Sequence, residues 1–236
     1  MHNYHWLVYD IFMGISERRE REKTERRNAI LGSARDLILL QGVERVSMEE
    51  IARRAELSKA TVYLYFSGKD VLLNEICEES AMSFLERFKP CLDSGLTGMS
   101  ALKCFWRRYL EVFGASNEML LIFQVRMYLN SWPAIAHPQE PSKSPYVDAI
   151  LGAMKTMIAQ CKAEGVFDAA LDLDHAIRIL LSLFSSIVES ASRPDTAPDG
   201  KKPAAIMEEA TRLFQIIIYG FAKEGVPRSR LDITAN

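Results

Sequence analysis

Three helix-start signals follow one another closely, at residues 47, 58 and 67. Residues 47–50, Ser-Met-Glu-Glu, form a capping box, in which a hydroxyl and a carboxylate satisfy the free amides of a first helical turn. Ser58 and the Ser-Gly-Lys-Asp stretch at 67–70 begin two further helices. Because only a short apolar pattern follows each of the first two starts, those helices must be short and joined by a tight turn. The spacing predicts a helix-turn-helix motif over about 47–66.

The rest of the chain also has helical periodicity, so we predict an all-α fold. Ile30, Ala34, Leu37 and Ile38 trace one face of a helix, and Gly42 stands where its C-cap would be. No stretch alternates with the period of a strand. Proline-rich segments at 132–145 and 194–203 are expected to be loops. The longer helices are expected at about 69–88, 98–115, 118–131, 144–164, 172–193 and 203–224.

Composition excludes several classes of function. A formal net charge of −2 gives no general attraction to polyanions, although residues 16–70 hold 12 Lys or Arg against 10 Asp or Glu. The four histidines are scattered, so neither a metal nor a cofactor is expected. The sequence has no G-x-S-x-G, H-E-x-x-H, phosphate-loop or dinucleotide motif, which argues against an enzyme.

The cysteines and the N-terminus bear on location. Four cysteines without a C-x-x-C pair are expected to be reduced thiols that pack as small hydrophobes in an intracellular, cytoplasmic protein. Residues 1–15 are apolar but too short to span a membrane, and they make a poor signal peptide. The change to a charged run after Gly14 suggests Met13 as an alternative to Met1 as the true start.

The helix begun by Ser58 has two kinds of side chain. Val62 and Phe66 are four residues apart and are expected to face inward, while Lys59, Thr61 and Tyr63 project near the exposed end. A helix of this kind fits a DNA major groove, where amines reach base edges and hydroxyls reach phosphates. Preceding the first helix, residues 17–28 are densely charged; they are either a helix extension with i,i+4 ion pairs or an arm that contacts DNA through Arg26 and Arg27.

Residues 26–73 resemble the N-terminal domain of TetR-type transcriptional regulators. One departure is Glu56, where family members often have glycine; either a glutamate there adopts a positive φ, at a cost of about 1 kcal/mol, or the turn differs slightly. The matching residues are Ala34, Gly42, Ser47, Ile51, Ala52, Ala55, Leu57, Ser58, Lys59, Ala60, Thr61, Val62, Tyr63, Tyr65, Phe66, Lys69, Leu72 and Leu73.

The resemblance implies a homodimer that binds a palindromic DNA operator, with a variable C-terminal domain that accepts a small-molecule effector. It implies that Lys59 and Ala60 contact base edges and that Leu64 touches a thymine methyl. The other implied DNA-contacting residues are Ser47, Ser58, Thr61, Tyr63, Tyr65 and Lys69. The expected divisions are an arm at 1–23, a DNA-binding domain at 24–84, and a ligand-binding and dimerisation domain at 85–236.

Two further sets of residues are assigned from the apolar patterns of the later helices. A pocket for an apolar or aromatic effector is expected at Trp106, Tyr109, Phe113, Phe123, Met127, Met154 and Met157. The wide apolar faces of the last two helices favour an intersubunit four-helix bundle over burial in the chain's own core, with the subunit interface at Ile177, Leu180, Leu181, Phe184, Ile206, Leu213, Phe214 and Ile217. His137 and Arg126 are candidates to orient a polar end of the effector. The favoured function is a repressor relieved by its ligand; a ligand-dependent activator and a helical dimeric adaptor remain as alternatives.

Overall fold

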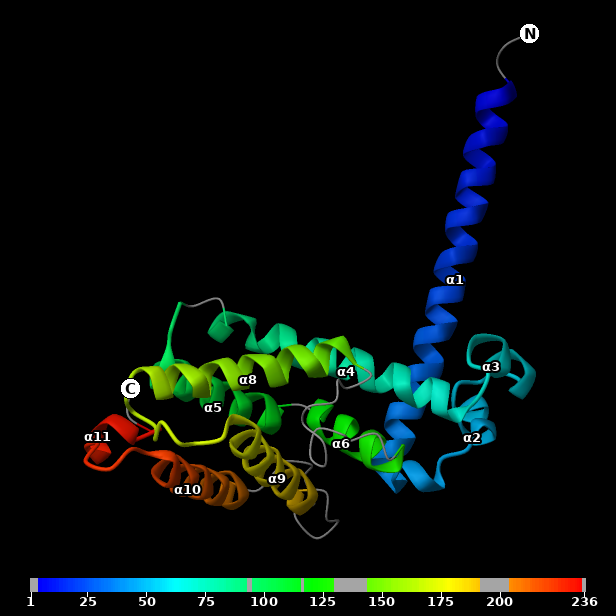
Figure 1. Cartoon of the computed structure of the whole chain (residues 1–236). Helices are drawn as coiled ribbons and strands as arrows, with labels where there is room; N and C mark the ends of the chain where they lie inside the picture. Colours follow the sequence, from blue (N-terminus) through cyan, green and yellow to red (C-terminus); the bar gives the residue numbers. More distant parts are fainter. Residues whose placement is uncertain (1–3, 93–94, 116, 130–143, 192–203, 235–236) are drawn as a thin grey trace. The chain divides into compact units, whose positions relative to one another are not determined.

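The computed structural model describes residues 4–92, 95–115, 117–129, 144–191 and 204–234, and this part of the chain is almost wholly helical (Figure 1). The predicted all-α class is confirmed. The helices are α1 Tyr4–Gln41, η1 Val43–Arg45, α2 Met48–Arg54, α3 Lys59–Tyr65, α4 Lys69–Leu92, α5 Gly98–Ala115, α6 Glu118–Tyr128, α8 Pro145–Ala163, α9 Leu173–Ala191, α10 Ala204–Phe221 and α11 Arg228–Leu231. The two segments expected to be proline-rich loops lie almost entirely outside the described residues.

The chain divides into two compact units, residues 1–76 and 77–236. The division falls within α4, whereas the sequence analysis sets a boundary eight residues later, between residues 84 and 85. Each unit has its own apolar core. In the first unit, buried side chains from α1, α2, α3 and α4 make up this core: Ile30, Ile38, Ile51, Val62 and Leu72. Gly42 ends α1 with a φ of 81°, as its C-cap position predicts.

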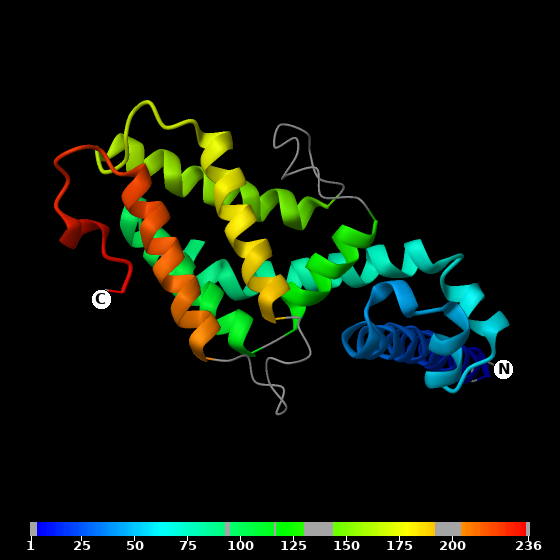
Figure 2. The same ribbon diagram turned by 90° about the horizontal axis from the view of Figure 1, so that it is seen from below.

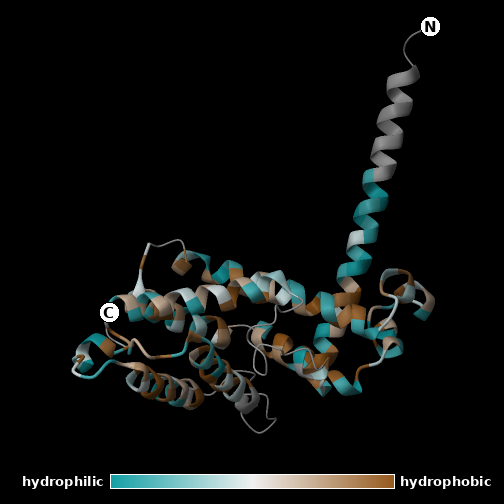
Figure 3. Ribbon diagram, viewed as in Figure 1, coloured by the Kyte–Doolittle hydropathy of each residue, from teal (hydrophilic) through white to brown (hydrophobic). Residues whose placement is uncertain are grey.

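The charged residues before Ala29 belong to α1, so this stretch is an extension of the helix, and a DNA contact by Arg26 stays a prediction. This stretch is drawn in teal in Figure 3 because its residues are hydrophilic. Arg18 and Glu22 form an i,i+4 pair 3.0 Å long, and the Thr24 hydroxyl donates to the carbonyl of Glu20. Local pairs of this kind support a helix whose charged side chains are mostly exposed.

One expectation for the end of α4 and one for the cysteines are wrong. The helix was expected to end near Phe88, before Pro90, but it continues to Leu92 with Pro90 inside its last turn. A proline this close to a helix end removes only one backbone hydrogen bond.

Cys91, in the last turn of α4, is joined to Cys104 of α5 by a disulfide, with Cα atoms 5.8 Å apart. The expectation of four reduced cysteines therefore holds only for Cys77 and Cys161, which are free and buried.

The second unit is built from helices packed in pairs: α5 on α8, α8 on α9, and α9 on α10. Figure 2 shows α9 and α10 side by side. The isolated backbone pairing of Phe167 with Ala222 ties the turn after α8 to the end of α10. Within the described ranges, no helix is both long enough and apolar enough to cross a membrane.

Several residues expected at a subunit interface belong to the chain's own core. Because α9 contacts α6, α8 and α10, its wide apolar stripe is covered within a single chain. The buried members of the expected set are Ile177, Leu180, Leu181, Phe184 and Phe214. The other three, Ile206, Leu213 and Ile217, lie on α10 and are partly or fully exposed. The helical periodicity identified the apolar stripe but not the element that covers it.

Candidate nucleic-acid interface

Helix α2 begins with the predicted capping box. The backbone N–H of Glu50 donates to the Ser47 hydroxyl over 3.2 Å, and the backbone N–H of Ser47 donates to the Glu50 carboxylate over 3.0 Å. The Ser47 hydroxyl also donates to the Glu50 carboxylate at 3.0 Å, and this bond, together with the one from the Ser47 amide, lowers the pKa of the Glu50 carboxyl. The first turn of α2 is thus held by its own sequence, and it places Ser47 at the surface.

The turn between α2 and α3 contains the strained residue that the sequence predicts. Glu56 has a φ of 57°, the one positive value among the non-glycine residues described. A left-handed residue reverses the chain direction, and the Leu57 amide then bonds to the Ala52 carbonyl at 2.9 Å. The turn therefore keeps the usual geometry of a helix-turn-helix without the usual glycine.

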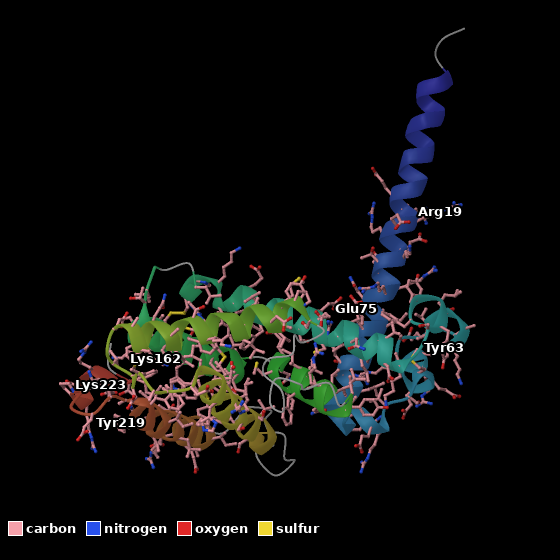
Figure 4. All side chains as sticks on the ribbon, viewed as in Figure 1. Arg19, Tyr63, Glu75, Lys162, Tyr219 and Lys223 are labelled. Carbon is pink, nitrogen blue, oxygen red and sulfur yellow. A yellow bond between two sulfur atoms is a disulfide. The ribbon has the colours of Figure 1, made fainter. Side chains whose placement is uncertain are left out.

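Helix α3 presents one face to the core and another to solvent. Ser58 caps it, with its hydroxyl accepting from the Thr61 amide at 3.0 Å. Val62 and Phe66 are buried as expected, whereas Leu64 is 85% exposed. Figure 4 shows Tyr63 on the outer side of α3. Lys59 and Ala60 are likewise exposed, while Thr61 and Tyr65 are half-buried.

Contacts between the helices bring the two lysines near the start of α2. The Nζ of Lys59 lies 3.4 Å from the Glu49 carboxylate, in the first turn of α2. The Nζ of Lys69, at the start of α4, donates to the Glu44 carbonyl at 3.4 Å. Glu44 and Glu49 stand on either side of Ser47 in the sequence, so both lysines lie near this helix start. One surface therefore holds α3, Lys69 and the N-terminus of α2, which we call the reading surface.

Arg27 has a structural role that the sequence analysis did not assign. Its guanidinium stacks over the Phe66 ring, 5.6 Å from the centroid, and pairs with the Glu75 carboxylate. These contacts hold α1 against α3 and α4 within the first unit. Of the two arginines proposed as DNA contacts in the arm, Arg27 is thus engaged internally, while Arg26 is exposed.

The aromatic residues predicted to line an effector pocket are packed against one another in the second unit. Trp106 stacks on Phe214 with ring centroids 4.2 Å apart, and Tyr109 stacks on Phe184 at 4.5 Å. Burial raises the pKa of the Tyr109 hydroxyl far above its usual range, and that hydroxyl has no hydrogen-bond partner in the part of the chain that the structure describes. Phe113, Met154 and Met157 are also buried, Phe123 is half-buried, and the side chain of Met127 lies outside the described residues.

Within the described residues, no group of three or more His, Cys, Asp or Glu side chains is placed to hold a metal ion. What the first unit does offer is a capped pair of short helices, the second of which exposes a lysine, a tyrosine and a leucine. A helix-turn-helix with an exposed second helix defines a class of DNA-binding proteins.

Comparisons with known proteins agree with this class. Residues 30–76 match the family model described as bacterial regulatory proteins, tetR family. The chain is 24% identical over 162 residues to the HTH-type nicotine-responsive transcriptional repressor HdnoR of Paenarthrobacter nicotinovorans, which covers 66% of this chain and 80% of that protein. It is 27% identical over 104 residues to the Transposon Tn10 TetC protein of Escherichia coli, covering 44% of this chain and 52%, about half, of TetC.

The fold is similar to that of the transcriptional regulator FadR from Bacillus subtilis, solved in complex with stearoyl-CoA. The TM-score is 0.61 at 15% identity, and the match covers 81% of this chain and 97% of FadR. Residues 30–76 are thus similar to the tetR family of bacterial regulatory proteins, and HdnoR and FadR, to which the chain is similar, are transcriptional regulators.

Proposed function

We propose that the protein is a homodimeric repressor that binds a palindromic operator and is released from it by a small-molecule effector. The observation that carries the proposal is the exposed leading end of α3, where Lys59, Ala60 and Tyr63 stand free of the apolar core. The first residues of a recognition helix are those that reach base edges in the major groove.

The reading surface supports distinct roles for its residues. Lys59 and Ala60, at the start of α3, are proposed to contact base edges, and Leu64 to contact a thymine methyl. The other predicted residues are proposed to contact phosphates, because they offer hydroxyls, or in one case an amine, around the same helix starts. They are Ser47, Ser58, Thr61, Tyr63, Tyr65 and Lys69.

A dimer is proposed to form through α10. This helix leaves Leu213 40% exposed and Ile216 62% exposed, with Tyr219 beside them in helical spacing. A symmetric partner would cover this apolar face by placing the same helix against it. Two copies would then present two α3 helices, which must lie about 34–36 Å apart to enter successive major grooves.

The effector is proposed to be apolar or aromatic and to act in the cytoplasm. The printed names of two similar proteins point the same way: HdnoR is nicotine-responsive and FadR was solved with stearoyl-CoA. In this chain, buried aromatic and methionine side chains of α5 and α8 supply a matching environment. A ligand among these helices would act on operator binding through α4, which belongs to both units.

The test is a comparison of single substitutions on operator binding, with the operator first selected from random duplexes. Lys59→Ala is expected to cost about 1–3 kcal/mol in affinity and to relax one base position. Tyr63→Phe is expected to weaken binding to all sequences alike, because it removes a phosphate contact. Lys223→Ala, an exposed lysine of the second unit (Figure 4), is the matched control for loss of one positive charge.

The result also separates the alternatives. If both reading-surface variants bind every duplex as the parent does, the protein is a helical adaptor and the proposal fails. If ligand tightens operator binding instead of releasing it, the protein is a ligand-dependent activator or co-repressed regulator.

A further inference from the structure

The second unit contains a buried arginine that is only partly neutralised. The Arg126 side chain, on α6, is 3% exposed, and its Nη2 donates to the Glu78 carboxylate of α4 at 3.1 Å. Its Nε is buried and has no hydrogen-bond partner among the described residues. A buried polar group without a partner is uncommon and costs stability, and a buried cation needs an anion with good geometry.

The second carboxylate oxygen of Glu78 also has a hydrogen-bond partner. The hydroxyl of Ser144, the N-cap of α8, donates to the second Glu78 oxygen at 2.8 Å and accepts from the Val147 amide at 3.2 Å. The carboxylate of Glu78 therefore lies between a guanidinium and the start of a 19-residue helix, two features that both favour a negative charge. The guanidinium and the start of α8 together stabilise one carboxylate between them.

The side chains of Arg126 and Glu78 differ in how easily they can leave the ion pair. Arg126 is fixed in the core, whereas the Glu78 side chain is 29% exposed and so can turn toward water. The remaining neighbour, the Cys77 thiol, is neutral, since burial raises its pKa, and it cannot replace the carboxylate. Glu78 is therefore an internal occupant that an outside carboxylate could displace.

A second ion pair also joins α4 and α6, but its cation is exposed. Arg87 of α4 pairs with Glu118 of α6 over 3.2 Å, but here the arginine is the exposed partner. Losing that contact would leave Arg87 solvated, so nothing there requires an anion. Among the ion pairs of the described residues, the Arg126 pair alone combines a buried cation with a partly exposed counterion.

We propose that Arg126 anchors the carboxylate of an effector with an apolar body, and that this carboxylate displaces Glu78 from the guanidinium. The carboxylate would bind through Nε and Nη2, which satisfies the donor that Glu78 leaves unpaired. The apolar body would lie along α6, whose neighbouring Ile122 and Val125 are buried and which packs against the apolar stripe of α9. Its regulatory consequence rests on the proposed function: Glu78 lies on α4, so its displacement acts on the helix that begins at the reading surface.

The test measures binding of octanoate and of its neutral analogue octanamide by calorimetry to the full-length protein. Glu78→Gln removes the competing carboxylate while keeping the side-chain shape. It is expected to bind octanoate more tightly than the wild type by about tenfold or more, since a charge-assisted pair to a buried guanidinium becomes available. Octanamide should not distinguish the two proteins. Glu86→Gln, an exposed glutamate of the same helix, is the matched control and should behave as the wild type.

Two variants guard against an effect of altered folding. Glu78→Gln leaves Arg126 without its counterion, so its melting temperature should fall and octanoate, but not octanamide, should restore it. The double variant Glu78→Gln/Arg126→Gln removes both charges and should lose the gain in octanoate affinity. Failure of Glu78→Gln to bind octanoate more tightly than the wild type, or an equal gain for octanamide, overturns the proposal.

Operator binding is measured separately in the same proteins. If octanoate binds Glu78→Gln as expected but saturating octanoate leaves the operator affinity of the wild type unchanged, the carboxylate site stands and the effector-released repressor fails. If octanoate abolishes operator binding, both the carboxylate site and the effector-released repressor are supported.

Discussion

At the scale of single residues, Lys59 is proposed to contact a base edge, yet its ammonium group is paired with Glu49. Both side chains are exposed, so the pair is weak, and DNA must replace the glutamate with a base edge or a phosphate. The Glu49 carboxylate would also lie close to the DNA backbone and repel it. Glu49 is therefore expected to lower operator affinity in two ways, by pairing with Lys59 and by its own negative charge.

Replacing Glu49 with glutamine is expected to raise operator affinity by roughly two- to fivefold, the range of an exposed ion pair. The gain should shrink as salt is raised, because screening weakens the pair and the repulsion alike. Fluorescence anisotropy with a labelled operator at two salt concentrations measures both effects. Glu224→Gln, an exposed glutamate of the second unit, makes the same change in net charge and should have no effect. Unchanged or weaker binding by Glu49→Gln would contradict this account.

The residues of the reading surface differ in how far sequence alone predicts them. The Ser47 capping box and the Ser58 cap follow from rules that act over three or four residues, and both are confirmed. The positive φ of Glu56 is one of two alternatives that the family resemblance implies, and the structure has it. The partner of Lys59 lies ten residues away, across the turn, and the stacking of Arg27 on Phe66 spans 39 positions of sequence. Such contacts depend on how helices pack, which a local pattern does not contain.

At the scale of elements, the junction of α4 and α5 is where local rules fail. The absence of a C-x-x-C pair favours reduced cysteines, but two helices that fold back on each other bring Cys91 and Cys104 together from 13 positions apart. The same fold-back explains why α4 continues through Pro90: its last turn is held on α5 by the cross-link. In reducing cytoplasm, disulfides are rare and are often redox-sensitive.

Replacing Cys104 with serine is expected to lower the free energy of unfolding by about 2–4 kcal/mol, the usual contribution of a disulfide that closes a loop of this size. Urea unfolding followed by circular dichroism under oxidising conditions measures the difference. A reducing agent should destabilise the wild type by a similar amount and leave Cys104→Ser unchanged. Equal stability of the two proteins without reductant would show that the cross-link contributes nothing.

At the scale of the whole molecule, the helical periodicity of the sequence predicted the class of fold and the approximate place of nearly every long helix. It did not predict which apolar residues of α9 and α10 are buried within the chain and which are exposed. Both helices have wide apolar stripes, but α9 is enclosed by three neighbours and α10 keeps one side open, at Leu213 and Ile216. Burial is a property of the assembled unit, so two similar stripes have different surroundings.

A dimer formed through α10 should separate when a charge is placed on this open face. Ile216→Glu is expected to give a monomer in sedimentation-velocity runs, because a partner helix would have to bury the carboxylate. Operator affinity should fall sharply as well, since one reading head binds a single half-site. Leu40→Glu, at an exposed leucine of α1, is the matched control and should sediment as the wild type does. A dimer of unchanged strength for Ile216→Glu would place the subunit contact elsewhere.

The stack of Trp106 on Phe214 and Phe184 has a practical consequence. An indole enclosed in apolar rings emits at shorter wavelength than one in water, and its brightness responds to any new neighbour. The chain thus has a native optical reporter at the centre of its second unit, where entry of a small molecule between α5, α9 and α10 would change the emission without any added label.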